Sequence, residues 1–304
     1  MKKVKHAFTM IELLIVIVIL GILAKFGTEL LLRIYEDYVV GTMNNRLLSH
    51  SEVAVTQIAN RLQYRVRESM VVHQNGNITP IANTVDAQDN GTVFEWIGYD
   101  VDGMRGDEIS TAPTWSGFID VDHIAGTTIN LVSPGSDWNR IASVITSLSP
   151  NGAVAPALFF IGDDSIQVMN GFGWNGVGLA NQNGNMHPVN IGGGADQFSP
   201  TVGNFSGVNV YEYYRLAWTA YALELFADPI PSDANRLSLR LWYGYQPWNG
   251  EQFNQGTSRV LMQGVTSLAF ATIGDTLKVQ VCVGDSKLSG GTGAFSVCKE
   301  KTIY

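Results

Sequence analysis

The feature that most constrains this chain is a nearly unbroken apolar run over residues 7–24, which follows a basic head containing Lys2, Lys3 and Lys5. One ionisable side chain, Glu12, interrupts the run. A carboxylate within hydrocarbon costs about 2.5 kcal/mol or more unless something compensates it. The run predicts a membrane-spanning helix, and the position of Glu12 indicates a function beyond anchoring.

Two ordinary interpretations of this segment are open. A basic head, an apolar core and a small residue such as Ala24 are typical of a secretory signal peptide, although Ile22 occupies a position where a small residue is expected. A plain signal anchor, with the lysines holding the N-terminus in the cytoplasm, fits the charge pattern. Neither interpretation explains Glu12.

The segment Ala7-Phe8-Thr9-Met10-Ile11-Glu12 resembles the class III leader of type IV pilins and type II secretion pseudopilins. The resemblance implies that prepilin peptidase cuts between Ala7 and Phe8, that the new amino group of Phe8 is methylated, and that Glu12 becomes the fifth mature residue. The family usually has Gly before the cut, whereas this chain has the similarly small Ala7. Pairing of Glu12 with the new cation of a neighbouring subunit would make this charge an assembly determinant.

The resemblance implies a pilin-like α+β fold, in which a long helix packs on a largely antiparallel, β-rich head. We expect a cleaved leader at residues 1–7, a transmembrane helix at 8–32, an amphipathic helix at 33–74 and a head at 75–304, with an elaboration at 83–204. Residues 8–32 are long enough to cross a bilayer core of about 30 Å. A continuous helix from Phe8 to the end of the amphipathic part would be about 100 Å long.

The amphipathic part is predicted from apolar residues that recur at helical spacing, namely Leu48, Val55, Ile58, Leu62 and Val66. Asn75, Gly76 and Pro80 are expected to end the helix.

In the head, short apolar runs predict strands at residues 93–99, 117–121, 127–132, 157–161 and 165–169. We also expect a short helix at 139–148, a long surface loop at 170–196, and a hairpin formed by 211–226 and 237–243. Further strands are expected at 258–270, 277–283 and 295–298.

The stretch Leu261–Phe270 contains the pattern Leu-x-x-Gly-Val-x-Ser and precedes a predicted terminal β-meander. In this it is similar to the J-type minor pseudopilins and related minor pilins, whereas the K-type tip pseudopilin typically lacks the Glu found here as Glu12. The resemblance implies a minor pilin or pseudopilin that co-assembles into, and helps initiate, a type IV pilus or type II secretion pseudopilus. The alternative is a surface-displayed adhesion or cargo-binding module on a pilin stalk.

The implied partners are other pilins or pseudopilins, prepilin peptidase, an inner-membrane assembly platform and, before assembly, membrane lipid. The implied location is the bacterial inner membrane, with the N-terminus cytoplasmic and the head periplasmic, and then a periplasmic or surface filament. The chain carries 19 basic and 27 acidic residues, and loss of Lys2, Lys3 and Lys5 with the leader leaves 16 against 27, a net charge of −11. This balance argues against a nucleic-acid partner.

The two cysteines, Cys282 and Cys298, lie on the exported side of the predicted membrane helix. In an oxidising compartment we expect them to form a disulfide, which would close a loop of about 15 residues and add about 3 kcal/mol of stability. Two unrelated buried thiols are the alternative. Without His partners at ligand spacing, the pair does not predict a zinc site.

No cofactor is expected, but two acidic stretches are weak calcium candidates because they offer hard oxygen ligands on turns. The stronger contains Asp100, Asp102, Asp107 and Glu108, and the weaker contains Asp120, Asp122 and His123. No HExxH, GxSxG or GxxxxGK[ST] sequence occurs, so we expect no enzyme.

The densest aromatic group could be a sugar- or surface-binding stripe, but alternating aromatic residues on a strand favour a core position. The group consists of Trp242, Tyr243, Tyr245 and Trp248.

Overall fold

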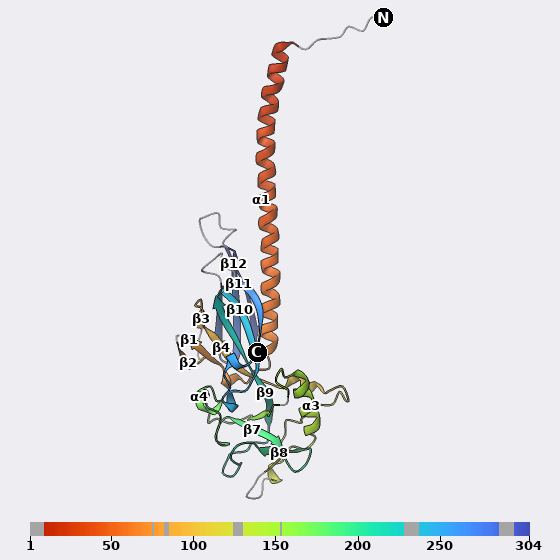
Figure 1. Ribbon diagram of the computed structural model, residues 1–304, viewed down its shortest axis with the longest axis vertical. Helices are drawn as coiled ribbons and strands as arrows, with labels where there is room; N and C mark the ends of the chain where they lie inside the picture. Colours follow the sequence, from red (N-terminus) through yellow and green to blue (C-terminus); the bar gives the residue numbers. More distant parts are fainter. Residues whose placement is uncertain are drawn as a thin grey trace. The chain divides into compact units, whose positions relative to one another are not determined.

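A computed structural model describes residues 9–74, 76–81, 85–123, 130–152, 154–227, 237–285 and 295–304 (Figure 1). The chain divides into two compact units, residues 1–49 and residues 50–304. The leader boundary at residue 7 and the membrane limit at residue 32 stay predictions.

The first long element is helix α1, Met10–Leu62. It contains an 18-residue window with a mean hydropathy of 2.5 that is 0% buried, and in the described part of the chain it is the one helix long and apolar enough to cross a membrane. Large apolar side chains such as Leu14 and Phe26 are exposed along its N-terminal part. The predicted apolar helix is therefore confirmed.

The predicted end of this helix near residue 74 is wrong, because α1 ends at Leu62. Beyond it, Val66 donates its backbone N–H to Ile97 at 2.8 Å, so the chain exchanges helical hydrogen bonds for contacts with a strand. A single 3₁₀ turn, Arg67–Ser69, leads into strand β1, Val71–Gln74. β-Branched residues in this stretch fit a pleated surface better than a helix interior.

The head contains an antiparallel sheet whose strands differ in length, and this agrees with the predicted β-rich head. Its strands lie in the order β13-β12-β11-β10-β9-β6-β7-β8-β5, while β4 pairs with both β1 and β9, β2 pairs with β1, and β3 pairs with β11. All the pairings are antiparallel. The remaining strands are β2 (Asn77–Pro80), β3 (Val85–Ala87), β4 (Val93–Tyr99), β5 (Leu131–Val132), β6 (Ala157–Phe160), β7 (Met186–Ile191), β8 (Gln197–Pro200), β9 (Tyr214–Ala227), β10 (Leu237–Tyr245), β11 (Thr257–Ile273), β12 (Thr276–Asp285) and β13 (Phe295–Ile303).

The long C-terminal strands follow the sequence pattern closely. The predicted hairpin is β9 paired with β10, and the three predicted strands after it correspond to β11, β12 and β13. Two earlier predicted strands are β4 and β6, and the short helix is α3, Trp138–Leu148. Asp137 caps α3 by accepting hydrogen bonds from Asn139 and Arg140 N–H groups.

Three predicted segments in the middle of the chain are wrong or incomplete. Residues 117–121 form only an isolated bridge between Phe118 and Tyr213. Residues 165–169 are not a strand and lead into the short helix α4, Val168–Gly171. Of 127–132, only Leu131–Val132 forms a strand, and 127–129 lie outside the described residues.

The expected surface loop at 170–196 is also wrong, because Phe172 and Trp174 are buried and β7 lies within it. Gly173 makes this close packing feasible. A Cβ on Gly173, whose φ is +86°, would lie 2.2 Å from the carbonyl oxygen of Pro247.

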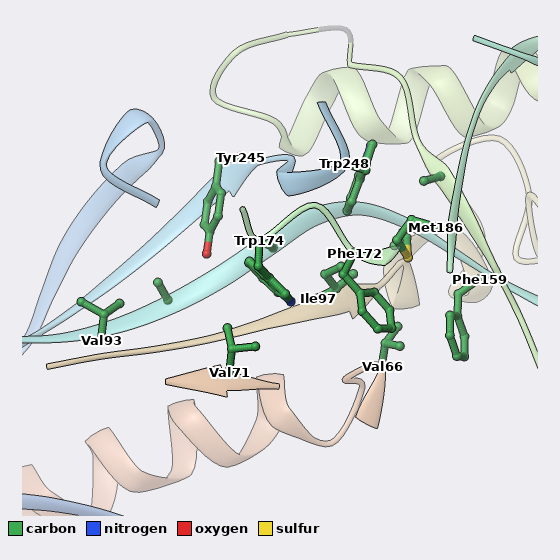
Figure 2. Close-up of a cluster of buried hydrophobic side chains, with 14 residues drawn as sticks. Val66, Val71, Val93, Ile97, Phe159, Phe172, Trp174, Met186, Tyr245 and Trp248 are labelled. Atoms are coloured by element: carbon green, nitrogen blue, oxygen red, sulfur yellow. The ribbon is translucent and has the colours of Figure 1, made fainter. Parts of the chain in front are cut away.

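Among the described residues, two of the clusters of buried side chains lie on either face of strand β9. The first core, shown in Figure 2, comprises Val66, Val71, Val93, Ile97, Ala157, Phe159, Phe172, Trp174, Met186, Ala217, Ala220, Ala222, Tyr245 and Trp248. The second core comprises Trp115, Ile119, Leu131, Trp138, Ile141, Ile145, Leu158, Phe160, Val189, Phe198, Phe205, Tyr214, Leu216 and Trp218.

Strand β9 contributes to both cores because successive side chains on a strand point to opposite faces. Ala217 belongs to the first core, whereas Leu216 and Trp218 belong to the second. The segment 83–204 supplies β4 and β6 to the sheet and side chains to both cores. It is thus an integral part of this head, and its status as an elaboration of a smaller pilin head stays a prediction.

Candidate functional site

At the N-terminal end of α1, Thr9 and Glu12 form a reciprocal cap. The Thr9 backbone N–H donates to Glu12 Oε2 at 3.5 Å, and the Glu12 N–H donates to Thr9 Oγ1 at 3.4 Å. This is the geometry of a capping box, and a carboxylate in the first turn also interacts favourably with the helix dipole. Ala7 and Phe8, the predicted cleavage residues, lie outside the described residues.

Sequence reasoning identified Glu12 but missed Thr9, although the signature Thr-x-x-Glu was visible as Thr9-Met10-Ile11-Glu12. The cap means that Glu12 has a partner within its own chain. Both hydrogen bonds are longer than the range of about 2.7–3.2 Å that is normal for an N–H···O bond. The carboxylate is therefore held in place at the helix start while remaining only weakly engaged.

Of the four stronger calcium candidates, Asp100 and Asp107 are engaged by protein partners, whereas Asp102 and Glu108 are exposed. Asp100 Oδ1 accepts from the Gly103 N–H at 3.0 Å and so caps the short helix α2, Val101–Arg105, while its Oδ2 accepts from Trp115 Nε1 at 3.2 Å. Burial raises the pKa of the Asp100 carboxyl to about 6, and these hydrogen bonds oppose the shift.

Asp107 forms a bidentate ion pair with Arg140 of helix α3. Arg140 Nε donates to Asp107 Oδ2 at 2.8 Å, and Arg140 Nη2 donates to Asp107 Oδ1 at 3.1 Å. The hydrogen bonds from Arg140 lower the pKa of the Asp107 carboxyl to about 2. Asp102 makes only a loose contact with Arg105, at 3.9 Å.

Within the residues the structure describes, no group of three or more His, Cys, Asp or Glu side chains is arranged to hold a metal ion. In the weaker candidate, Asp120 Oδ1 accepts from the backbone N–H of Asp122, and the side chain of His123 lies outside the described residues. Asp100, Asp107 and Asp120 thus act as turn and ion-pair residues, and calcium binding stays a prediction without support from the described residues.

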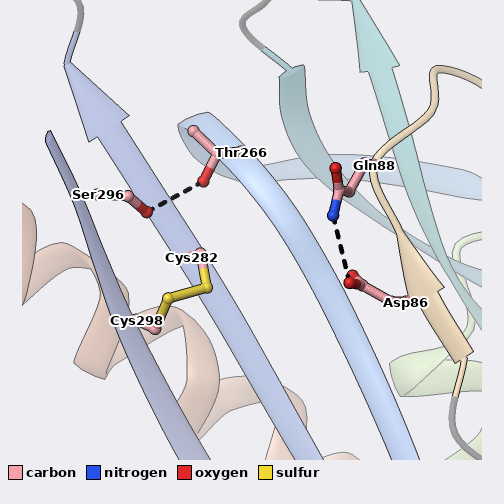
Figure 3. The surroundings of a disulfide bond; sticks show 6 residues. All are labelled: Asp86, Gln88, Thr266, Cys282, Ser296 and Cys298. Atoms are coloured by element: carbon pink, nitrogen blue, oxygen red, sulfur yellow. Dashed lines mark hydrogen bonds between the residues drawn. A yellow bond between two sulfur atoms is a disulfide. The ribbon is translucent and has the colours of Figure 1, made fainter. Parts of the chain in front are cut away.

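Near the C-terminus, Cys282 and Cys298 form a disulfide (Figure 3). They lie directly opposite each other on the neighbouring strands β12 and β13. The predicted pairing is present, and it ties β13, which pairs only with β12 among the described strands, to the rest of the sheet.

The aromatic group at 242–248 lies largely within the core. Tyr245 and Trp248 are buried in the first core, and the Tyr245 hydroxyl donates to Glu95 Oε2 at 2.6 Å. Trp242 is partly buried, and its Nε1 donates to Glu224 Oε2 at 2.8 Å. These contacts fit the core interpretation and not a binding stripe.

The structure contains a polar cleft of about 420 Å³ that sequence reasoning did not find. It lies at the C-terminal end of α1 and is lined by Asn60, Arg61, Gln63, Tyr64, Gly98, Tyr99, Asp100, Val101, Asp102, Arg105, Trp218, Thr219 and Tyr221. These residues come from α1 and the turn after it, from β4, from α2 and from β9. The separated segments carry no local motif that could have revealed the cleft.

Aromatic rings and guanidinium groups alternate around this cleft. Tyr64 and Tyr99 meet edge to face at 5.6 Å, Arg105 lies over the Tyr64 ring at 5.9 Å, and Arg215 lies over the Tyr99 ring at 5.0 Å. Burial raises the pKa of the Tyr221 hydroxyl to about 12, so this group stays protonated.

Comparison with known proteins adds one match. Residues 2–24 match the model of the prokaryotic N-terminal methylation motif. No curated protein and no solved structure matches the chain.

Proposed function

We propose that this chain, a member of the type IV pilin and pseudopilin family by its N-terminal methylation motif, is a minor subunit that co-assembles into a type IV pilus or type II secretion pseudopilus. The observation that carries the proposal is the coincidence of this motif, at residues 2–24, with the start of an apolar helix long enough to cross a membrane. The motif points to a precursor that prepilin peptidase processes. It also points to a structural subunit in preference to an enzyme.

In the proposed assembly step, cleavage between Ala7 and Phe8 places a methylated amino group one residue before Thr9. Glu12 then exchanges its long hydrogen bonds to Thr9 for the cationic Phe8 terminus of a neighbouring subunit. A charge-assisted hydrogen bond is stronger than a neutral one and gains further in a low-dielectric environment. This difference in energy favours the assembled state over the separate membrane-anchored subunit.

The proposed location is the inner membrane with the head in the periplasm, followed by extraction into a filament. The size of the head supports a minor, initiating or tip-proximal subunit, because residues 50–304 form one large compact unit. A subunit repeated along a shaft benefits from a smaller head. The J-type subtype is part of this proposal and rests on the Leu261–Phe270 resemblance.

The test is replacement of Glu12 by Gln and by Ala, with Glu36→Gln as a matched control farther along α1. Gln keeps an acceptor for the Thr9 N–H but removes the charge. We expect membrane insertion and cleavage to be unchanged in all variants, as measured by fractionation and by mass spectrometry of the mature N-terminus. Incorporation into filaments should fall for both Glu12 variants and not for the control.

Normal filament incorporation of both Glu12 variants would contradict the proposed pairing. A protein that retains Met1 in membranes of cells with active prepilin peptidase would contradict processing.

The second candidate, a surface-displayed adhesion or cargo-binding module, is favoured by one observation, the polar cleft at the end of α1. Deletion of residues 83–204 would not separate the two functions because it removes β4 and β6 from the sheet. Point substitutions in the cleft do separate them. Intact filaments that have lost adhesion would support display, whereas lost filaments would support a purely structural role for these residues.

A further inference from the structure

We propose that the cleft at the C-terminal end of α1 binds an acidic saccharide, that is, a sugar whose ring carries a carboxylate. The proposal does not depend on the filament assignment, because every lining residue belongs to the compact unit 50–304. The volume of the cleft, about 420 Å³, lies within the range of about 300–1,000 Å³ that is typical of small-molecule sites.

The aromatic lining supplies faces on which the C–H side of a sugar ring can stack. Tyr64, Tyr99 and Tyr221 line the cleft and are partly exposed, whereas Trp218, which also lines it, is buried in the second core. Their amphipathic rings combine an apolar body with a polar tip, which suits a ligand that has both C–H and O–H groups.

One backbone feature indicates that the aromatic wall is a built structure. A Cβ placed on Gly98 would lie 2.6 Å from Tyr221 Cε2, so the ring occupies the space of the missing side chain. Tyr221 is also stacked on Trp96, with ring centroids 5.7 Å apart. The ring is thus fixed on one side by β4 and leaves the other side for the cleft.

The arginines at the cleft supply partners for a carboxylate, and two carboxylates, those of Asp100 and Asp102, also line it. Asp100 is 2% exposed and its oxygens accept from the Gly103 N–H and Trp115 Nε1, so Asp102 is the exposed carboxylate of the lining. Arg61 and Arg105 line the cleft, and Arg215 lies over the ring of Tyr99. The Arg105 contact with Asp102 is long, at 3.9 Å, and both side chains are mostly exposed, so it neutralises little of the charge.

Arg61 uses Nη1 to donate to the Gln57 carbonyl oxygen at 3.1 Å, which leaves its other N–H groups free for a ligand. Among the described residues, no carboxylate forms an ion pair with Arg61 or Arg215. The planar guanidinium fork matches a carboxylate in a bidentate arrangement.

The combination favours an acidic sugar over simpler ligands. A bare inorganic anion would use the arginines but not the aromatic wall, and a neutral sugar would use the wall but would offer the arginines only uncharged acceptors, which form weaker hydrogen bonds than a carboxylate. A nucleic acid needs an extended basic track, which a chain with a net charge of −8 does not favour. The amides of Asn60 and Gln63 add neutral partners suited to sugar hydroxyls.

The test uses the full chain in neutral detergent micelles, titrated by calorimetry with a uronic acid trisaccharide. The corresponding neutral trisaccharide and a short single-stranded oligonucleotide are titrated in parallel. We expect saturable binding of the uronate, with affinity at least about tenfold weaker for the neutral sugar because the charge-assisted contacts are lost. The oligonucleotide should bind no better than the neutral sugar.

Arg105→Gln is the main variant, because this exposed side chain forms only one loose ion pair and its removal is compatible with folding. We expect about a tenfold loss of uronate affinity, and Tyr64→Ala should weaken both sugars. Arg259→Gln is the matched control, since Arg259 is an exposed arginine on β11 that does not line the cleft. Circular dichroism verifies that each variant is folded.

Four results would each overturn the proposal. They are the absence of saturable uronate binding, equal affinity for the acidic and neutral sugars, tighter binding of the oligonucleotide, and an unchanged uronate affinity in Arg105→Gln.

Discussion

Replacement of His187 should make the head more resistant to acid. His187 lies on β7 and is 3% exposed, with its ring 4.6 Å from that of Phe160 and 6.0 Å from that of Phe205. Its Nδ1 has no hydrogen-bond partner within the described part of the chain. An ionised imidazole here would be poorly solvated, so the folded state favours the neutral ring.

Burial lowers the pKa of His187 from its usual 6.5 to about 4, and the nearby Asp163 carboxylate opposes the shift. Between these values the unfolded chain holds more protons than the folded protein, so stability falls as the pH falls. The whole pKa shift corresponds to about 3 kcal/mol of unfolding free energy, of which about 2 kcal/mol is lost between pH 7 and pH 4.5. Above the usual pKa of histidine, none of this free energy of unfolding is lost.

Asp100 acts in the opposite direction. Burial raises the pKa of its carboxyl from 3.8 to about 6, so in this window the folded protein holds the extra proton and stability rises as the pH falls. The two shifts partly cancel in the wild-type protein. The informative quantity is therefore the difference between a variant and the wild type at two pH values.

The assay is urea unfolding of the full chain in neutral detergent, followed by tryptophan fluorescence at pH 7 and pH 4.5. His187→Phe keeps a ring beside Phe160 and Phe205. The free energy of unfolding that this variant loses between pH 7 and pH 4.5 should be about 2 kcal/mol smaller than the loss in the wild type. His187→Gln should behave alike if it folds, and the exposed His50→Gln serves as the control. The same pH dependence in the wild type and both His187 variants would refute the reasoning.

Two further predictions concern the C-terminal strands and the start of α1. Joint replacement of Cys282 and Cys298 by Ala should lower the free energy of unfolding by about 3 kcal/mol, which is measured as a lower melting temperature. A reductant should lower the melting temperature of the wild type and not that of the variant. Equal melting temperatures of the oxidised wild type and the variant would contradict this prediction. Thr9→Ala should loosen the first turn of α1 by about 1 kcal/mol, seen as faster amide exchange near Glu12, whereas Thr28→Ala, which loses only hydrogen bonds inside the helix, should not affect that turn. Unchanged exchange in Thr9→Ala would count against the cap.

The elements that the sequence predicted best are those in which the period of apolar residues repeats over one long continuous stretch. The apolar part of α1 and the alternating strands β9 to β12 each carry many residues of one period. The end of α1 was misplaced because Val66 satisfies its backbone N–H on Ile97, and this contact across the fold cannot be read from the helical spacing.

The middle of the chain was predicted poorly because its short segments depend on distant partners. Phe118 has strand-like neighbours in sequence, but its only bridge is to Tyr213. Trp174 lies in a Gly- and Asn-rich stretch that resembles a surface loop, yet it is buried against the first core. In such segments burial is decided by packing and not by local composition.

The candidate sites divide in the same way. Glu12 could be identified because a charge within an apolar run is conspicuous in one short stretch. The cleft at the end of α1 could not, since its aromatic and cationic lining is brought together from residues 60–64, 98–105 and 218–221.

The acidic stretch that suggested calcium also holds in place one segment that lines the cleft, the short helix α2. Asp107 holds Arg140, whose Nη2 also donates to the carbonyl oxygens of Ser110 and Ala112, so the loop after α2 is fastened to α3. Asp100 caps α2 from the other end. The carboxylates thus fix the short helix that carries Arg105 to the edge of the cleft, and so position the guanidinium that we expect to bind the ligand.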